Sequence, residues 1–361
     1  MRFADVIGNA SVARMLASMA DNSRVAHALL LYENEGSGAL PLALAYVQYL
    51  CCQNPHDGDS CGECPSCRQI SKLIYPDMHF VFPVNKGPKT NDDKPTSESY
   101  LKCWRELVLQ DPYFTEAQLQ KALGVENKNT LIAVAEAQKL ISKLSLTSVA
   151  DSYKSVIFYL PEKMNQETAN RLLKIVEEPP EKTIFIFITH SPEKVLQTIF
   201  SRCQSIRVLP LSREEAAKVR ALSPFDQDED DSSYMDIFSD LMGALMRSDL
   251  LLAQEVMEAA IESKDPGSLS SRERQKAFCS FVGKCLRNIF LLQNGQSTLT
   301  DYPGQYEDFY QTAARACSQS FCQKTAEALS KTVSLIDRNV NSQILFCDLV
   351  NRLYYNMKQA R

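Results

Sequence analysis

Ser155-Val156-Ile157-Phe158-Tyr159-Leu160 is rich in β-branched and aromatic side chains, and this short run predicts a buried strand. Asn165 follows as the expected N-cap of a helix. A second strand is predicted over 183–189 and a third over 204–208, with a helix between them that opens at Ser191-Pro192-Glu193. Strands that alternate with helices at these spacings predict βαβ units and a parallel sheet, which is an α/β fold.

A further strand is predicted upstream, over 26–31, and it runs into the glycine turn Gly36-Ser37-Gly38. A helix is expected to follow this turn and to end near Cys52. In a phosphate-binding loop at this place, a Lys would reach the phosphates and a Ser or Thr would hold magnesium. Ala39 and Leu40 supply neither group. From spacing alone, the favoured interpretation is a plain glycine turn without nucleotide ancestry.

The other half of a nucleotide-hydrolysing site would be acidic residues at the end of a buried strand, where they hold magnesium and activate water. The strand that begins at Ser155 ends instead in Tyr159-Leu160-Pro161, and the first acidic residue after it is Glu162. Both halves of such a site therefore lack the groups that the chemistry requires.

Four cysteines follow the helix expected after the glycine turn, in the pattern C-x8-C-x2-C-x2-C: Cys52, Cys61, Cys64 and Cys67. Structural zinc takes four such ligands in a tetrahedron, and zinc is the favoured interpretation. An iron–sulfur cluster is the main alternative, although ferredoxin motifs place a further Cys where this chain has Ser71. Disulfides and free thiols also stay open. Cys51 and His56 compete for the fourth ligand position, but a buried and a solvated side chain are the simpler interpretations.

The composition is that of a globular protein with room for two or three domains, with 361 residues, 45% hydrophobic and 23% charged. No apolar run is long enough for a membrane span, and the first residues form no apolar signal region. We therefore expect a cytoplasmic protein whose twelve cysteines are reduced. The net charge of −5 implies that any DNA contact depends on a local basic patch or on partner subunits.

The acidic run over 226–231 predicts a domain boundary, because the pattern beyond it is entirely helical. Residues 276–293 and 343–357 each place apolar side chains on one face of a helix. We expect these stripes to be exposed in the isolated chain and covered in an obligate complex. Before the boundary, 86–96 predicts an exposed loop, and the second of two helical pieces after it opens with the capping box Thr115-x-x-Gln118.

Besides the four cysteines, a series of short motifs occurs in order along residues 1–208: Phe3-x-x-Val6-Ile7-Gly8, His27-Ala28, Pro76-Asp77-x-His79, Met164-Asn165, Ala169-Asn170-x-Leu172-Leu173-Lys174, Glu177-Glu178-Pro179-Pro180 and Ser201-Arg202-Cys203. Each motif alone is weak, but the combination is specific. Together they resemble the delta-prime subunits of bacterial DNA polymerase III clamp loaders, within the AAA+ family. The C-terminal part matches only in its helical character.

The resemblance implies a division of the chain into three parts. An AAA+-like domain over 1–208 would carry a zinc module inserted at 52–67, with structural zinc on the four cysteines. A reduced lid or linker over 209–231 and a helical collar for oligomerisation over 232–361 would follow. The segment 86–128 is longer than the family's usual connection, so we expect a surface element specific to this lineage, and the sequence assigns it no chemistry.

The resemblance also implies that the nucleotide site is degenerate. Ala39 and Leu40 occupy the positions of the family's Lys and Thr, beside Gly36 and Gly38. Tyr159-Leu160 occupies the position of its acidic pair. These departures are typical of delta-prime and not of the loader's ATPase subunits, so no bound nucleotide is expected.

By the same resemblance, Arg202 reaches across a subunit interface to the ATP of a neighbouring ATPase subunit as an arginine finger. A surface arginine paired with a carboxylate is the plain alternative. The implied function is that of a non-hydrolysing subunit of the DNA-directed DNA polymerase III holoenzyme, without intrinsic catalysis. Its partners would be the tau/gamma ATPase subunits, the delta subunit and, through the complex, the sliding clamp and primer–template DNA.

Two other functions stay open. One is an ATP-hydrolysing clamp-loader subunit of the tau/gamma type. The other is a zinc-module protein that binds nucleic acid directly, although only Arg68 and Lys72 follow the cysteines closely, which is little for phosphate contacts.

Overall fold

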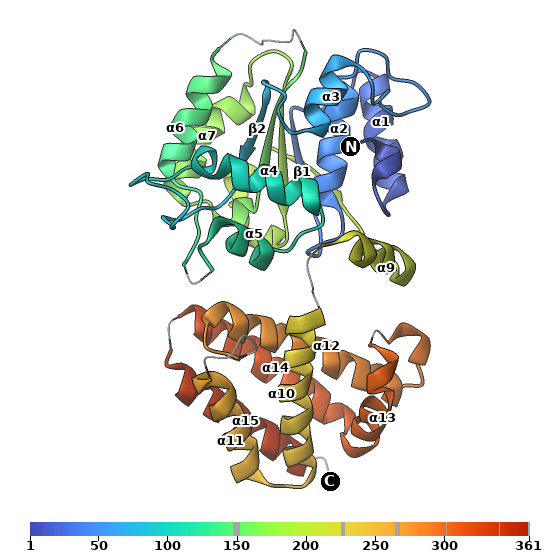
Figure 1. The fold of residues 1–361 in the computed structure, drawn as a ribbon, viewed down its shortest axis with the longest axis vertical. Coiled ribbons are helices and arrows are strands. Elements are labelled where there is room, and N and C mark those ends of the chain that lie inside the picture. The colour runs from blue at the N-terminus through green and yellow to red at the C-terminus, as the bar shows by residue number, and fades with distance from the viewer. Residues whose placement is uncertain are drawn as a thin grey trace. The chain divides into compact units, whose positions relative to one another are not determined.

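The computed structural model describes residues 1–126, 128–146, 152–224, 228–263, 268–300, 302–338 and 340–359. They form two compact units, Met1–Pro224 and Phe225–Arg361, each of which is described by itself (Figure 1). The division falls within the predicted linker, and Asp226 and Gln227 of the acidic run lie outside the described residues. The finer three-part division stays a prediction.

The first unit is built on a parallel sheet with the strand order β2-β3-β4-β1-β5. Its strands are β1 (Ala28–Tyr32), β2 (Met78–Val81), β3 (Lys154–Tyr159), β4 (Thr183–Thr189) and β5 (Gln204–Arg207). Every residue of β3 and β4 is buried, as expected for strands covered on both faces. The predicted α/β fold with a parallel sheet is confirmed.

Helices cover both faces of this sheet (Figure 1). On one face lie α6 (Val134–Leu144) and α7 (Gln166–Glu177), whose apolar side chains form one cluster with those of β3 and β4. On the other lie α1 (Ala10–Asp21), α2 (Ala39–Leu50) and α3 (Pro65–Ser71). Asn165 caps α7 as predicted, since its side chain accepts a 2.8 Å hydrogen bond from the backbone N–H of Thr168.

The helix predicted to open at Ser191-Pro192-Glu193 is much shorter than expected. A single 3₁₀ turn, Pro192–Lys194, is followed by extended backbone at Val195, and only then by α8 (Gln197–Phe200). The Ser191 side chain makes no capping hydrogen bond, so the expected N-cap is missing.

The segment 86–128 is more than a surface element, contrary to our expectation. It contains α4 (Leu101–Gln110) and α5 (Glu116–Leu123), and Thr115 forms the predicted capping box with Gln118. Trp104 of α4 is fully buried, stacks on Phe82 at a centroid distance of 4.4 Å and meets Phe114 edge-on at 5.5 Å. These aromatic contacts make the segment part of the core of the first unit.

After β5, the described part of the first unit ends with α9 (Arg213–Leu222), where Ser212 and Glu215 form a capping box. Through residue 224, no further helix is described. The region predicted as a reduced lid or linker thus contains one helix among its described residues up to 224, and its role as a lid stays a prediction.

The second unit is helical throughout its described residues, as predicted. Its helices are α10 (Asp228–Met246), α11 (Leu250–Glu262), α12 (Arg272–Gln293), α13 (Glu307–Ala316), α14 (Gln319–Asp337) and α15 (Ser342–Lys358). The expectation that the apolar stripes of α12 and α15 are exposed is wrong. Leu286, Ile289, Leu349 and Leu353 are each at most 3% exposed, because the stripes pack into the core of this unit. No helix among the described residues is both long and apolar enough to cross a membrane.

Candidate functional site

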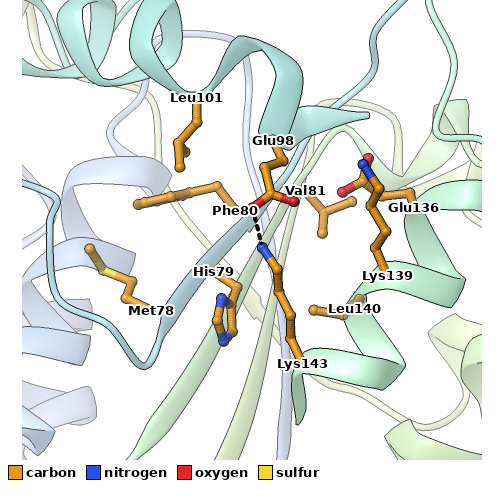
Figure 2. A pocket seen from close by; sticks show the side chains of 10 residues that line it. All are labelled: Met78, His79, Phe80, Val81, Glu98, Leu101, Glu136, Lys139, Leu140 and Lys143. Carbon is orange, nitrogen blue, oxygen red and sulfur yellow. Dashed lines mark hydrogen bonds and ion pairs between the residues drawn. The ribbon is translucent and has the colours of Figure 1, made fainter. Parts of the chain in front are cut away.

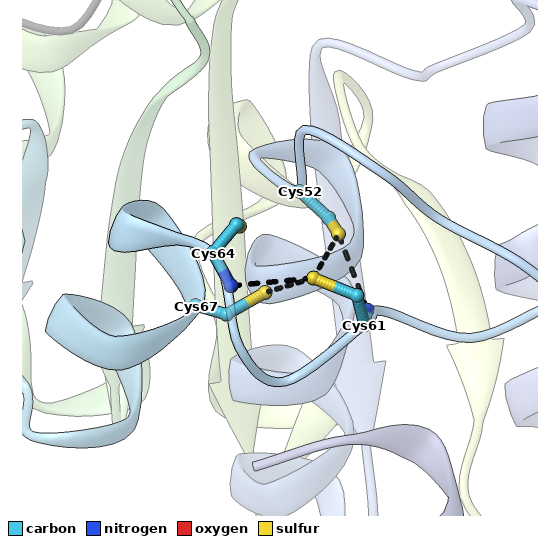
Figure 3. Close-up of side chains that lie close together, drawn as sticks. All are labelled: Cys52, Cys61, Cys64 and Cys67. Atoms are coloured by element: carbon cyan, nitrogen blue, oxygen red, sulfur yellow. Dashed lines mark hydrogen bonds between the residues drawn. The ribbon is translucent and has the colours of Figure 1, made fainter.

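The four predicted metal ligands lie together (Figure 3). Cys52 follows α2, Cys61 lies in the loop, Cys64 is the N-cap residue of α3 and Cys67 lies in its first turn. All four sulfur atoms lie within 4.8 Å of one another, with Cys52–Cys61 at 3.5 Å and Cys61–Cys67 at 3.9 Å. A tetrahedron with metal–sulfur bonds of about 2.3 Å requires sulfur separations of about 3.8 Å. The cluster therefore fits a metal ion such as zinc.

Backbone hydrogen bonds support this cluster. The N–H of Cys61 donates to the sulfur of Cys52 at 3.2 Å, and the N–H of Cys64 donates to the sulfur of Cys61 at 3.4 Å. The N–H groups of Cys64 and Glu63 lower the pKa of the Cys61 thiol to about 6, which favours the thiolate. Cys51 is buried against the backbone oxygen of Tyr153, and the side chain of His56 is exposed, as the simpler interpretation of each predicted.

The segment before Cys61 also holds the N-terminus. The carboxylate of Asp59 accepts hydrogen bonds of 2.9 Å from the backbone N–H groups of Phe3 and Ala4. The Met1 ammonium donates to Gln48 at 2.8 Å, and Gln48 donates to Ser60 at 2.9 Å. The position of the first residues thus depends on the fold of the cysteine segment.

The glycine turn between β1 and α2 contains Gly36 and Gly38, with φ values of +78° and +104° that favour glycine. Ala39 and Leu40 begin α2 with buried, apolar side chains, so neither offers a group to a phosphate. The backbone N–H of Ala39 donates a 2.8 Å hydrogen bond to the carboxylate of Glu33. N–H groups at a helix N-terminus are the usual site of phosphate binding, and here one of them is taken by a carboxylate of the same chain.

A buried imidazole lies on the other side of Glu33. His190 directly follows β4, the neighbour of β1 in the sheet, and its Nε2 lies 3.4 Å from Glu33 Oε1. Burial alone lowers the pKa of His190, but the contact with Glu33 and the charges of Glu35 and Glu162 outweigh it, so that the pKa is raised. The buried Glu33 carboxylate therefore lies between a backbone hydrogen-bond donor and an imidazole whose protonated form it favours.

Tyr113, from the loop between α4 and α5, covers the glycine turn. Its hydroxyl accepts a 2.7 Å hydrogen bond from the N–H of Ile7 and donates to the oxygen of Ile7 at 3.2 Å. Its ring lies so close to Gly38 that an added Cβ there would come within 3.0 Å of a ring carbon. Nearby, the N–H of Glu116 donates to Glu35, and Lys163 pairs with Glu116. The segment 86–128 thus occupies the space beside the turn.

Tyr159 and Leu160, at the end of β3, are buried. Tyr159 meets His190 edge-on at a centroid distance of 5.6 Å. Glu162, the first acidic residue after the strand, accepts a 2.8 Å hydrogen bond from the Thr189 hydroxyl and one from the His190 backbone. Its carboxylate therefore binds the end of β4.

Arg202 follows α8 and is paired with Glu177, the last residue of α7. Its Nε and Nη2 both contact Oε1 of Glu177, and its Nη1 donates to the backbone oxygen of Thr198 at 2.7 Å. The Arg202 side chain is 32% exposed.

Sequence reasoning assigned no role to four residues of this region: Glu33, Tyr113, His190 and Glu177. Two of them had a signal, since Glu33 closely follows a predicted strand and Glu177 belongs to a quoted motif.

A separate small cavity of about 40 Å³ lies beside β2 (Figure 2). His79, Phe80 and Glu136 contribute to its lining, and an ion pair of 2.8 Å joins Glu98 and Lys143 at its edge. Burial lowers the pKa of His79 to about 4. This volume has room for about one water molecule and excludes a nucleotide.

Comparison with known proteins identifies the family. A family model described as "DNA polymerase III, delta subunit" matches residues 8–212, and several delta-prime subunits match at about 30% identity. The chain belongs to the DNA polymerase III delta-prime subunit family. The delta-prime subunit of Yersinia pestis is 31% identical over 192 residues, which are 53% of this chain and 44% of that protein.

More distant relatives of this delta-prime family member include the tau/gamma subunit of Haemophilus influenzae, 22% identical over 216 residues, which are 60% of this chain and 25% of that protein. Among solved structures, a gamma subunit-related protein of Thermotoga maritima aligns over 96% of this chain and 99% of its own, with 14% identity and a TM-score of 0.40. This chain spans about half the length, or less, of the curated relatives that it matches.

Proposed function

We propose that this chain is a non-hydrolysing clamp-loader subunit of the delta-prime type, which helps to load the sliding clamp of DNA polymerase III onto primed DNA. Its membership of the delta-prime family supports the proposal that it acts within a clamp-loader complex. Its partners in this proposal are the tau/gamma ATPase subunits and the delta subunit, and DNA is reached through the complex.

One observation carries the non-hydrolysing part of the proposal: Glu33 holds the Ala39 N–H at the start of α2. A nucleotide phosphate at this turn would have to displace a buried carboxylate from that N–H and from His190. Tyr113 would also have to leave the glycine turn. Even then, no Lys or hydroxyl side chain stands at 39 or 40 to bind the phosphates or magnesium.

The proposal assigns Arg202 to the ATP of a neighbouring subunit. A guanidinium placed at a transferring phosphoryl group stabilises the charge that develops there. Partial exposure of Arg202 supports this role, because a group that acts in trans must be accessible from outside its own chain. In the same proposal the four cysteines hold a structural zinc ion, and the chain itself contributes no catalysis.

The test has two arms. First, labelled ATP is offered to the isolated chain, and we expect no saturable binding at millimolar ATP; binding followed by hydrolysis would establish the tau/gamma-type alternative. Second, the chain is reconstituted with its tau/gamma and delta partners, and DNA-stimulated ATP hydrolysis and clamp loading are compared with those of Arg202→Ala. We expect normal assembly with reduced hydrolysis, and unchanged hydrolysis would refute the trans role. Tight, salt-sensitive DNA binding by the isolated chain would favour the nucleic-acid-binding alternative.

A further inference from the structure

The contact between Arg202 and Glu177 fixes the direction of the guanidinium. Two of its nitrogen atoms, Nε and Nη2, contact the same carboxylate oxygen of Glu177. The third, Nη1, donates to the backbone oxygen of Thr198. A planar group held through all three nitrogen atoms has little freedom to rotate.

These contacts leave part of the guanidinium available. Arginine carries more N–H donors than the contacts with Glu177, Thr198 and the Ser201 hydroxyl use. The Arg202 and Glu177 side chains are 32% and 44% exposed, so a phosphate group of another subunit has access to the pair. Arginine binds such an oxyanion best when its fork is oriented in advance.

The support for Glu177 is itself rigid. Ala169, Leu172 and Val176 of α7 are buried in the cluster that includes the central strands. The helix ends at Glu177, directly before Glu178 and Pro179. Thr198, the other residue that holds the guanidinium, lies in α8. The neighbouring Ile199 is 2% exposed, and α7 and α8 pack together. The sheet therefore positions both groups that hold the guanidinium.

We infer that Glu177 is a positioning residue for Arg202, whose carboxylate orients the guanidinium toward a phosphate group of ATP bound by the adjacent subunit. This inference rests on the proposed trans role of Arg202. An exposed ion pair contributes little to folding, so replacing Glu177 is expected to leave the fold intact and to change the orientation of Arg202.

The test measures DNA-stimulated ATP hydrolysis by the reconstituted complex. The relevant part of this rate is the difference between wild type and Arg202→Ala, which is the part that depends on Arg202. Glu177→Ala is expected to lower this part at least about fivefold through kcat, with KM for ATP within about twofold, because orientation matters most in the transition state. Glu177→Gln keeps a hydrogen-bond acceptor and is expected to retain more than about half of it. Glu178→Ala, which removes the adjacent exposed carboxylate, is the matched control and is expected to behave like wild type.

The outcomes separate this inference from the function on which it rests. If Arg202→Ala has no effect, the proposed trans role of Arg202 fails and the positioning role fails with it. If Arg202→Ala lowers hydrolysis and Glu177→Ala does not, only the positioning role is overturned. A loss caused by Glu177→Ala that persists in the Arg202→Ala background, or that Glu177→Gln does not rescue, would also overturn it. Glu177→Lys, which repels the guanidinium, serves as the second variant if Glu177→Ala does not assemble, and it is expected to show the same loss.

Discussion

The backbone N–H of Ala39 and the carboxylate of Glu33 form a 2.8 Å hydrogen bond across the glycine turn. An α-helix begins at Ala39, and the positive end of its dipole favours an anion at this place. In phosphate-binding loops the anion is a phosphate group of the ligand, whereas here it is the carboxylate of Glu33. The turn therefore has the backbone of an anion site, and the Glu33 carboxylate of the same chain occupies it.

This relationship predicts that Glu33 stabilises the first unit. Glu33→Ala leaves a buried N–H and a buried imidazole without their partner, and we expect a loss of about 1–3 kcal/mol in the free energy of unfolding. The chain has a single tryptophan, Trp104, which is buried in the first unit, so its fluorescence during urea unfolding reports on this unit. Glu214→Ala, an exposed change on α9, is the control. Equal stability of both variants would contradict the prediction.

His190 predicts a pH dependence of that stability. Its pKa in the folded chain is raised above the ordinary value of 6.5, so the folded chain binds the proton more tightly than the unfolded chain does. The stabilisation by this group is complete below about pH 6.5 and is lost as the pH rises through the raised value. We expect the difference in unfolding free energy between wild type and His190→Gln to decrease as the pH rises above about 6.5. A difference that grows with pH would show that the imidazole is held neutral.

The sequence predicted the strands that carry strong apolar runs, because full burial in a parallel sheet requires such runs. It missed β2, since Met78–Val81 is short and contains His79. It predicted too long a helix after Ser191. A proline favours the first turn of a helix but does not fix the residues that follow, and here the backbone is already extended at Val195.

The cysteine cluster was predictable because its ligands lie close together in sequence. The contacts of Glu33 and Arg202 were not, since each depends on a tertiary arrangement. Glu33 and His190 are brought together by the pairing of β1 with β4, and Arg202 meets Glu177 through the packing of α7 against α8. The apolar stripe of α15 illustrates the same limit, because periodicity shows a buried face without showing what buries it.

Tyr113 is expected to stabilise the segment that covers the glycine turn. Tyr113→Phe removes a hydroxyl that bonds to both backbone groups of Ile7, and we expect a loss of about 1–2 kcal/mol in the free energy of unfolding. Tyr32→Phe, at the less buried end of β1, is the control, measured by the same Trp104 fluorescence. If the two changes have equal effects, the bonds to Ile7 contribute nothing measurable.

The metal cluster predicts a coupling to the N-terminus. We expect about one zinc ion per chain by elemental analysis, as a structural site with four cysteine ligands requires. Chelation or Cys61→Ser loosens the loop that carries Asp59, so the amides of Phe3 and Ala4 lose their acceptor. Their hydrogen exchange is expected to accelerate at least about tenfold, because exchange follows local opening.

The amides of β4 serve as the internal control for this exchange measurement, since this strand is buried at the centre of the sheet. Iron in place of zinc would establish the cluster alternative, and unchanged exchange at Phe3 and Ala4 after metal removal would separate the N-terminus from the site.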